Sequence, residues 1–299
     1  MNENKLLYDT LNLMGDGGTT KAYEYLLSNL GQIDNRSSQV YNFLYCLAAT
    51  SGKQGEALDW MEEAIVKKGL WYRPEVYEDE DLDSIREDDR FKEYTSLSLA
   101  RYLEASKTVE TEFTWREVKA NTLIIVLHGN QQNNVVSKSH WSEIESPETQ
   151  VEYLQSHEID SYQLYRWEDD GDGPTQLKQV IHSVDWDKYS SKILAGFSAG
   201  CNTILRAIKE EDVECDKIIL QSPWIPCIES ELDELVSIIL KKKIEILMIC
   251  GLNDEVSLSQ CLEFDKKAKE TGLSYKTVLI DGLGHEYPDH FRDIVSEFL

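Results

Sequence analysis

The first third of the chain has apolar residues three and four positions apart, which is the spacing of an α-helix. The pattern is carried by Leu6, Leu7 and Leu11, then by Ala22, Leu26 and Leu30, and again by Ala57, Met61 and Ile65. Glycine breaks at 15–18 and at 51–52 divide it into helix pairs. Successive pairs begin about 35 residues apart, close to the period of helical repeat proteins. The pattern therefore predicts a small all-α, repeat-like domain over 1–105.

The remainder, 106–299, alternates short apolar runs with helical patterns. Apolar or alternating runs predict strands at 107–115, 122–127, 161–166, 192–195, 217–221, 244–250 and 275–280. Helical patterns predict helices at 175–182, from 199 onward, at 231–240 and 258–271, and after Pro288. The segment 131–155, which contains Trp141, is expected to border a binding site. This order predicts an α/β fold with a mainly parallel sheet flanked by helices, and functional residues at the carboxyl ends of its strands.

Composition narrows the classes of function. The chain has 299 residues, 41% of them hydrophobic, and 55 acidic against 30 basic residues. The net charge of −25 repels phosphate and anionic lipid, so neither nucleic acid nor a membrane is expected as a partner. The six cysteines lack metal-binding spacing, which favours buried thiols in a reducing compartment. With a polar, acidic start and no long apolar run, a cytoplasmic location is expected.

One stretch, KILAGFSAGCNTILRAI at 192–208, has the pattern of a buried strand, a tight turn and a helix. The turn is Gly196-Phe197-Ser198-Ala199-Gly200, the GxSxG spacing of a nucleophile elbow. In so tight a turn Ser198 has a strained backbone, and a side chain at Gly196 or Gly200 would collide with its neighbours. The alternative is that Ser198 only caps the following helix.

Two further strand ends provide the partners that a serine nucleophile needs. Asp254 follows the strand ILMIC, and His285 lies in a glycine-containing loop after KTVLI. Imidazole can take the serine proton near neutral pH, and a carboxylate can hold its other ring nitrogen. Asp254 could instead be only a turn residue or the cap of the helix after Ser257. His128 precedes the serine and is expected to order a loop, not to act as a base.

Residues 106–299 therefore resemble an α/β-hydrolase, nearest to the carboxylesterases, dienelactone hydrolases and acyl-protein thioesterases. The resemblance implies an oxyanion hole from the backbone N–H groups of Ala199 and Asn130. It departs from many such esterases at Ala199, where glutamine is common, and at Cys201, where a second glycine is common. The helical segment 41–69 resembles a tetratricopeptide repeat, whereas Asn29 departs from that pattern in the preceding repeat.

These residues predict a serine hydrolase that cleaves carboxylic esters through an acyl-enzyme on Ser198, with no metal or cofactor. Trp167 and Trp224 lie in segments expected to border the cleft and are candidate substrate contacts. A small-molecule ester is the expected partner, and the helical domain could bind a protein or a second copy of the chain. A serine peptidase or amidase of the same fold is an alternative. A non-catalytic interaction protein that uses the helical domain is another.

Overall fold

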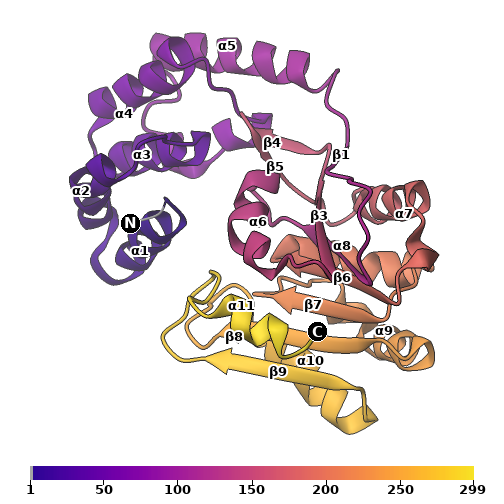
Figure 1. Ribbon diagram of the computed structural model, residues 1–299. Coiled ribbons are helices and arrows are strands. Elements are labelled where there is room, and N and C mark those ends of the chain that lie inside the picture. The colour runs from indigo at the N-terminus through magenta and orange to yellow at the C-terminus, as the bar shows by residue number, and fades with distance from the viewer. Residues whose placement is uncertain (1–2) are drawn as a thin grey trace. The chain divides into compact units, whose positions relative to one another are not determined.

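The computed structural model describes residues 3–299 and divides into two compact units (Figure 1). Unit 1 consists of Met1–Val109 and Ile159–Leu164, and unit 2 of Glu110–Glu158 and Tyr165–Leu299. Whether each unit folds independently, with the expected bounds 1–105 and 106–299, stays a prediction.

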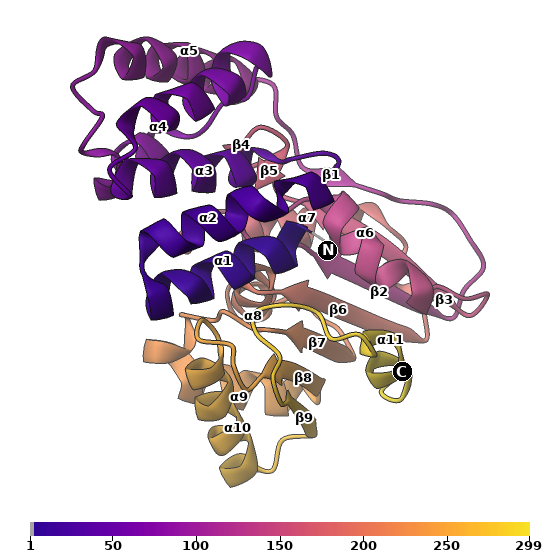
Figure 2. The same ribbon diagram turned by 90° about the vertical axis from the view of Figure 1, so that its left-hand side faces the viewer.

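Unit 1 is helical, as the apolar spacing predicts. Its helices are α1 (Glu3–Gly17), α2 (Thr19–Asn29), α3 (Ser38–Thr50), α4 (Gln54–Met61) and α5 (Asp89–Ala105). A π-helical turn at Glu62–Lys67 continues α4, and 3₁₀ turns cover Leu30–Gln32, Pro74–Tyr77 and Glu80–Leu82. Figure 2 shows α1 to α4 following one another as neighbours, and each contacts the next. Together they bury a core that includes Leu26, Leu44 and Met61.

The segment Ile159–Leu164 belongs to unit 1 although it is distant in sequence. Asp160 accepts a backbone hydrogen bond from Arg73 at 3.0 Å, and the hydroxyls of Ser38 and Ser161 lie 2.8 Å apart. Tyr162 donates its N–H to the carbonyl of Trp71 at 2.9 Å. These are contacts that no local pattern in the sequence predicts.

Unit 2 contains a seven-stranded sheet in the order β1-β3-β2-β6-β7-β8-β9. The strands are β1 (Glu112–Phe113), β2 (Thr122–Leu127), β3 (Thr149–Gln155), β6 (Ser191–Phe197), β7 (Lys217–Gln221), β8 (Glu245–Gly251) and β9 (Tyr275–Ile280). All neighbours pair in parallel except β1, which pairs antiparallel with β3. This arrangement confirms the expected fold class, a mainly parallel sheet flanked by helices with a helical region before it.

Helices cover both faces of this sheet, as Figure 1 shows. One face packs on α7 (Gly173–Ser183), α8 (Ala199–Glu210), α9 (Ile228–Lys242) and α10 (Leu258–Thr271). The other face packs on α6 (Asn134–Trp141), a 3₁₀ turn at Ser142–Ile144 and α11 (Phe291–Ser296). Because both faces are buried, the central strands are apolar runs, such as Leu123 to Leu127 with no exposed surface.

One sequence prediction in this region is wrong, and one strand of the main sheet is missed. The run 161–166 is not a strand of the main sheet; β4 (Ile159–Ser161) and β5 (Leu164–Tyr165) form a separate two-stranded sheet. The strand that the sequence patterns do not reveal is β3, which lies inside the segment 131–155 that is expected to border the binding site. Its polar residue Glu152 is fully buried and is bound by Arg116 at 3.1 Å and Thr114 at 2.9 Å. A buried and paired glutamate hides the strand pattern, because it is indistinguishable in sequence from a solvated one.

Among residues 3–299, no helix combines the length and the apolar character needed to cross a membrane.

Candidate active site

The turn from β6 to α8 has the strained geometry that its glycines indicate. Ser198 has a φ of 50° and a ψ of −120°, a conformation that costs an ordinary residue about 1–3 kcal/mol. Its side chain makes no capping hydrogen bond to α8, so the helix-cap interpretation finds no support. Its N–H donates to the carbonyl of Gln221 at 3.0 Å, which fixes the turn to the neighbouring strand β7. The hydroxyl is thereby held at the carboxyl end of the sheet.

Both flanking glycines are required by close backbone contacts. A Cβ atom on Gly196 would lie 2.8 Å from the backbone N of Cys201 in α8. A Cβ atom on Gly200 would lie 2.6 Å from the carbonyl oxygen of His128, just after β2. Neither contact can be relieved by rotating a side chain, so the turn accepts only glycine at both positions.

Gly200→Ala is therefore expected to destabilise the protein by about 1–3 kcal/mol and to displace the loop at His128. Thermal unfolding measures the first effect, and hydrogen exchange of the loop amides measures the second. Gly55→Ala is the matched control, because nothing lies within 4 Å of its added Cβ and it is in helix α4. Equal melting temperatures for the Gly200 variant and the wild type would contradict this packing account.

The structure brings Ser198, His285 and Asp254 together into one hydrogen-bonded row. His285 Nε2 lies 2.9 Å from the Ser198 hydroxyl, and His285 Nδ1 lies 3.0 Å from both carboxylate oxygens of Asp254. Ser198 follows β6, Asp254 follows β8 and His285 follows β9, so three separate strand ends meet here. The ring of Phe197 lies 5.1 Å from the imidazole of His285 and packs beside it.

Asp254 is fully buried, and its surroundings favour the charged form. Burial opposes ionisation, but hydrogen bonds from His285, the backbone N–H of Ser257 and the Ser222 side chain outweigh it and lower the pKa of the carboxyl. Its Oδ1 accepts the N–H groups of Val256 at 3.1 Å and Ser257 at 2.9 Å. Asp254 thus shapes the turn before α10 as well as facing the imidazole. Its predicted role as the partner of the imidazole is therefore compatible with its role as a turn residue.

His128 orders the loop after β2, as expected, and does not approach Ser198 as a base. Its Nδ1–H donates to the carbonyl of Gly129 at 2.7 Å, and its Nε2 accepts the N–H of Ser156 at 3.1 Å. Complete burial lowers its pKa to about 4, so the ring is neutral near pH 7. Both ring nitrogens are used, which fixes the tautomer and the loop.

The two backbone amides expected to form an oxyanion hole are those of Asn130, in the loop after β2, and of Ala199, at the start of α8. Within residues 3–299, neither the backbone N–H of Asn130 nor that of Ala199, the first residue of α8, donates a hydrogen bond. The Asn130 side chain accepts the N–H of Trp167 at 2.8 Å, which anchors this loop from the other side. Two N–H groups without an acceptor are available for an oxyanion hole, and the hole itself stays a prediction.

The two tryptophans expected to contact substrate differ in position. Trp167 is 2% exposed, stacks on His128 with ring centroids 5.1 Å apart, and donates its indole N–H to the carbonyl of His128 at 2.8 Å. These contacts favour a supporting role for Trp167 beneath the loop over the substrate contact expected from the sequence. Trp224 is half-buried and packs against the core after β7. It stays a candidate for substrate contact.

The acidic loop 168–173 contacts the carboxyl of Glu158, whose pKa is raised. Glu158 accepts the N–H of Glu168 at 2.5 Å. Burial, with the nearby charges of Glu168 and Asp172, raises the pKa of Glu158 to about 7. Because the folded state favours the protonated form, this group's contribution to stability is complete below its unfolded pKa of about 4.3 and is lost as pH rises through about 7.

Glu158→Gln is consequently expected to raise the melting temperature by about 2–4 °C at pH 8 and to change it little at pH 5. Glutamine keeps an oxygen that can accept the Glu168 N–H but carries no charge. Thermal melts at the two pH values test this, with exposed Glu143→Gln as control. An equal shift at both pH values would show that burial of the charge is not the cause.

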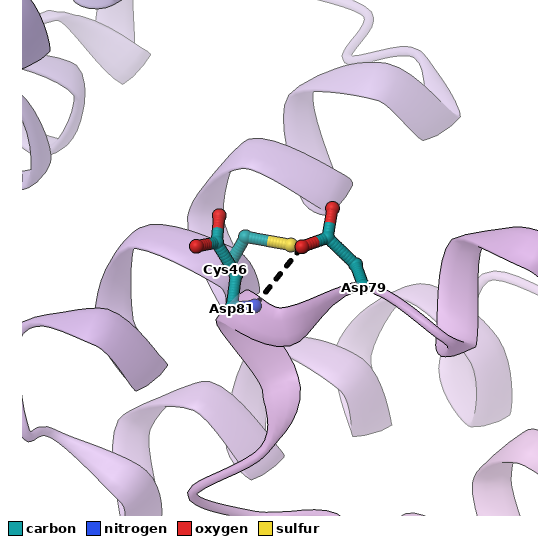
Figure 3. Close-up of side chains that lie close together, drawn as sticks. All are labelled: Cys46, Asp79 and Asp81. Carbon is teal, nitrogen blue, oxygen red and sulfur yellow. Dashed lines mark hydrogen bonds between the residues drawn. The ribbon is translucent and has the colours of Figure 1, made fainter.

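A separate cluster in unit 1 offers three potential metal-ligand atoms. The sulfur of Cys46 and carboxylate oxygens of Asp79 and Asp81 lie within 4.8 Å of one another (Figure 3). A metal would need the thiolate, whereas burial and the two aspartates raise the pKa of the Cys46 thiol. The Asp79 carboxylate instead accepts the backbone N–H of Asp81 at 2.9 Å and closes a tight turn, which explains the position of the Asp79 side chain. We assign no metal to this cluster.

Gln221 and Ser222 adjoin the Ser198–His285–Asp254 row. Sequence reasoning missed Gln221, and it named Ser222 only as part of the segment 222–224 that is expected to border the cleft. Gln221 is the last residue of β7, and its side-chain amide reaches the carbonyl of Glu286 at 2.9 Å. Ser222 has a φ of 43° and its carbonyl accepts the Ser257 hydroxyl at 3.0 Å. The available signal was a polar residue at the end of an otherwise apolar strand, KIILQ.

Comparison with known proteins gives a family match for part of the chain. A family model described as the N-terminal domain of A/B hydrolase-like proteins matches residues 2–106. The search of curated proteins finds no match. The tetratricopeptide-like character of this segment stays a prediction.

Solved structures resemble the chain over its whole length or over part of it. An uncharacterized protein from Bacillus cereus ATCC 10987 has 28% identity and a TM-score of 0.57, with 100% of this chain and 97% of that one covered. The Bacillus cereus carboxylesterase has 13% identity, a TM-score of 0.48, and coverage of 66% and 96%. Zea mays acyl-protein thioesterase 2 has 16% identity, a TM-score of 0.46, and coverage of 63% and 96%. At these values the last two likenesses say nothing about activity.

Proposed function

We propose that this chain, which belongs to the α/β-hydrolase superfamily, is a serine hydrolase that cleaves carboxylic esters through an acyl-enzyme on Ser198. The observation that carries the proposal is the row of hydrogen bonds from the Ser198 hydroxyl to His285 Nε2, at 2.9 Å, and from His285 Nδ1 to Asp254, at 3.0 Å. A strained serine at a strand-to-helix turn supports it.

In the first half-reaction His285 Nε2 takes the hydroxyl proton as Ser198 Oγ attacks the ester carbonyl. The carbonyl oxygen becomes an oxyanion, which the N–H groups of Ala199 and Asn130 stabilise; one such donor contributes about 3–4 kcal/mol to lowering the barrier. His285 then gives its proton to the leaving alkoxide, and the C–O bond breaks. The alcohol departs, and Ser198 carries the acyl group as an ester.

In the second half-reaction water replaces the alcohol. His285 takes a proton from the water as its oxygen attacks the acyl carbonyl, and returns the proton to Ser198 Oγ as the carboxylic acid leaves. Asp254, whose pKa is lowered, stays ionised throughout and stabilises the imidazolium that forms in each half. This chemistry needs neither a metal nor a cofactor.

A panel of p-nitrophenyl esters compared with aminoacyl anilides tests the reaction class. The proposal predicts ester hydrolysis with an initial burst of p-nitrophenol of about one equivalent per chain where deacylation is slow. Turnover of anilides without turnover of esters would favour the peptidase alternative. A binding partner or self-association through unit 1, and a cytoplasmic location, stay predictions.

A further inference from the structure

Gln221 contacts the segments that carry all three members of the Ser198–His285–Asp254 row, although it belongs to none of them. It ends β7, the strand between β6, which leads to Ser198, and β8, which leads to Asp254. Its side chain is completely buried. A polar side chain in such a position requires an explanation, because burying an amide is costly unless it is hydrogen-bonded.

The backbone of Gln221 fixes Ser198. Its carbonyl accepts the Ser198 N–H at 3.0 Å, in register with the pairing of Phe197 and Gln221 across the two strands. The position of the Gln221 backbone therefore sets the position of the strained turn.

The side chain of Gln221 fixes the histidine loop. Its Nε2 donates to the carbonyl of Glu286, the residue after His285, at 2.9 Å. A backbone carbonyl can only accept, so the NH₂ group, not the oxygen, must face it. No regular strand or helix holds this part of the loop, which runs from the end of β9 toward α11. This hydrogen bond therefore restrains the residue next to the imidazole directly.

The second N–H of the same amide donates to Ser222, which is linked to the turn that carries Asp254. Gln221 Nε2 donates to the hydroxyl of Ser222 at 3.0 Å. The Ser222 carbonyl accepts the hydroxyl of Ser257, whose backbone N–H donates to Asp254 Oδ1 at 2.9 Å. Ser222 adopts a φ of 43°, a conformation that is unfavourable for serine. Within the described residues, Gln221 Oε1 is buried and has no partner. Both donors of the amide are used while its acceptor is not, so the side chain is placed for donation.

From these contacts we propose that Gln221 is a positioning residue, which holds the His285 loop at hydrogen-bonding distance from Ser198. The inference rests on the proposed function, since it assigns a role in the alignment of that row. Gln221 does not touch the reacting atoms; it acts through Glu286, Ser222 and the Ser198 backbone. Its loss should affect the chemical step and not substrate affinity.

The test measures the rate at which a fluorophosphonate labels Ser198, together with kcat and KM for a p-nitrophenyl ester. Gln221→Met removes both donors at similar volume and should lower the labelling rate and kcat by about 10- to 100-fold with little change in KM. Gln150→Met is the matched control. Gln150 is also buried and also donates to a backbone carbonyl, that of Arg116, but lies near the amino end of β3, the opposite edge of the sheet.

Gln221→Glu gives a readout that loss of stability alone would not produce. Glutamate keeps the shape of the side chain but donates only when it is protonated. Dividing the labelling rate of Gln221→Glu by that of Gln221→Met removes the pH dependence that the two variants have in common. This ratio should therefore rise as pH falls and the new carboxyl takes up a proton. If Gln221→Met does not fold, the ratio of Gln221→Glu to wild type serves instead, with the same expected pH trend.

The outcomes separate this inference from the proposed function. Labelling of Gln221→Met at the wild-type rate, a pH-independent ratio, or an equal loss in Gln150→Met would overturn the role of Gln221 while the hydrolase assignment stands. A wild type that is not labelled at all would overturn the proposed function, and the role of Gln221 with it.

Discussion

Replacing Ser198 by alanine is expected to lower kcat for ester hydrolysis by about 10⁶-fold, the scale seen when a serine nucleophile is removed from a working triad. The loss is large because the hydroxyl forms the covalent bond, and no neighbouring group can replace it. Cys201 is fully buried, and burial raises the pKa of its thiol, so it offers no second nucleophile. Steady-state assays on purified protein, with Ser183→Ala as a matched control, measure the effect.

The same position also tests the strain in the turn. Glycine has no Cβ and tolerates a φ of 50°, so Ser198→Gly should be inactive yet more stable than wild type, by about 1 kcal/mol or more. Thermal unfolding of the glycine and alanine variants separates relief of strain from simple loss of the hydroxyl. Activity near the wild-type level in either variant would place the nucleophile elsewhere.

Asp254→Asn is expected to lower kcat by about 10⁴-fold with the fold intact. Oδ1 of Asp254 accepts the N–H groups of Val256 and Ser257, so the asparagine oxygen will occupy that place. The NH₂ group then takes the place of Oδ2, which faces His285 Nδ1 at 3.0 Å in the native chain. Oδ1 also lies 3.0 Å from His285 Nδ1 and can still accept from it, but the new NH₂ group favours the tautomer that accepts at Nδ1 and carries its proton at Nε2. That is the wrong tautomer for a base toward Ser198.

The matched control for this change is Asp289→Asn, an exposed aspartate after the His285 loop. Kinetic assays with circular dichroism spectra distinguish a wrong tautomer from a misfolded turn. A loss of less than about tenfold in Asp254→Asn would show that the carboxylate only shapes the turn before α10, and that the imidazole is oriented by another group.

The sequence predicts the row of Ser198, Asp254 and His285 because each residue lies in the short segment that follows an apolar strand. In a parallel sheet the carboxyl ends of the strands meet at one edge, so local patterns are sufficient to bring these groups together. The glycines at 196 and 200 add a steric signal that the close contacts of the turn explain. The same reasoning gives the correct fold class.

The remaining features depend on tertiary contacts that have no local signature. Strand β3 carries Glu152, whose partner Arg116 lies 36 positions earlier in the chain. The run 161–166 has the alternation of a strand, but much of it pairs with residues of unit 1. Trp167 looks like a cleft residue and is packed under the loop instead. Gln221 is missed for the same reason, since its role depends on where Glu286 lies.

The central claim is that the Ser198 hydroxyl is the activated nucleophile of this chain. Its most direct test is peptide mapping by mass spectrometry after reaction of the folded protein with a fluorophosphonate. The account predicts one adduct per chain, on the peptide that contains Ser198, and its disappearance in His285→Ala, whose imidazole no longer activates the hydroxyl. A folded wild type that carries no adduct on Ser198, or that is modified equally well without the imidazole, would contradict it.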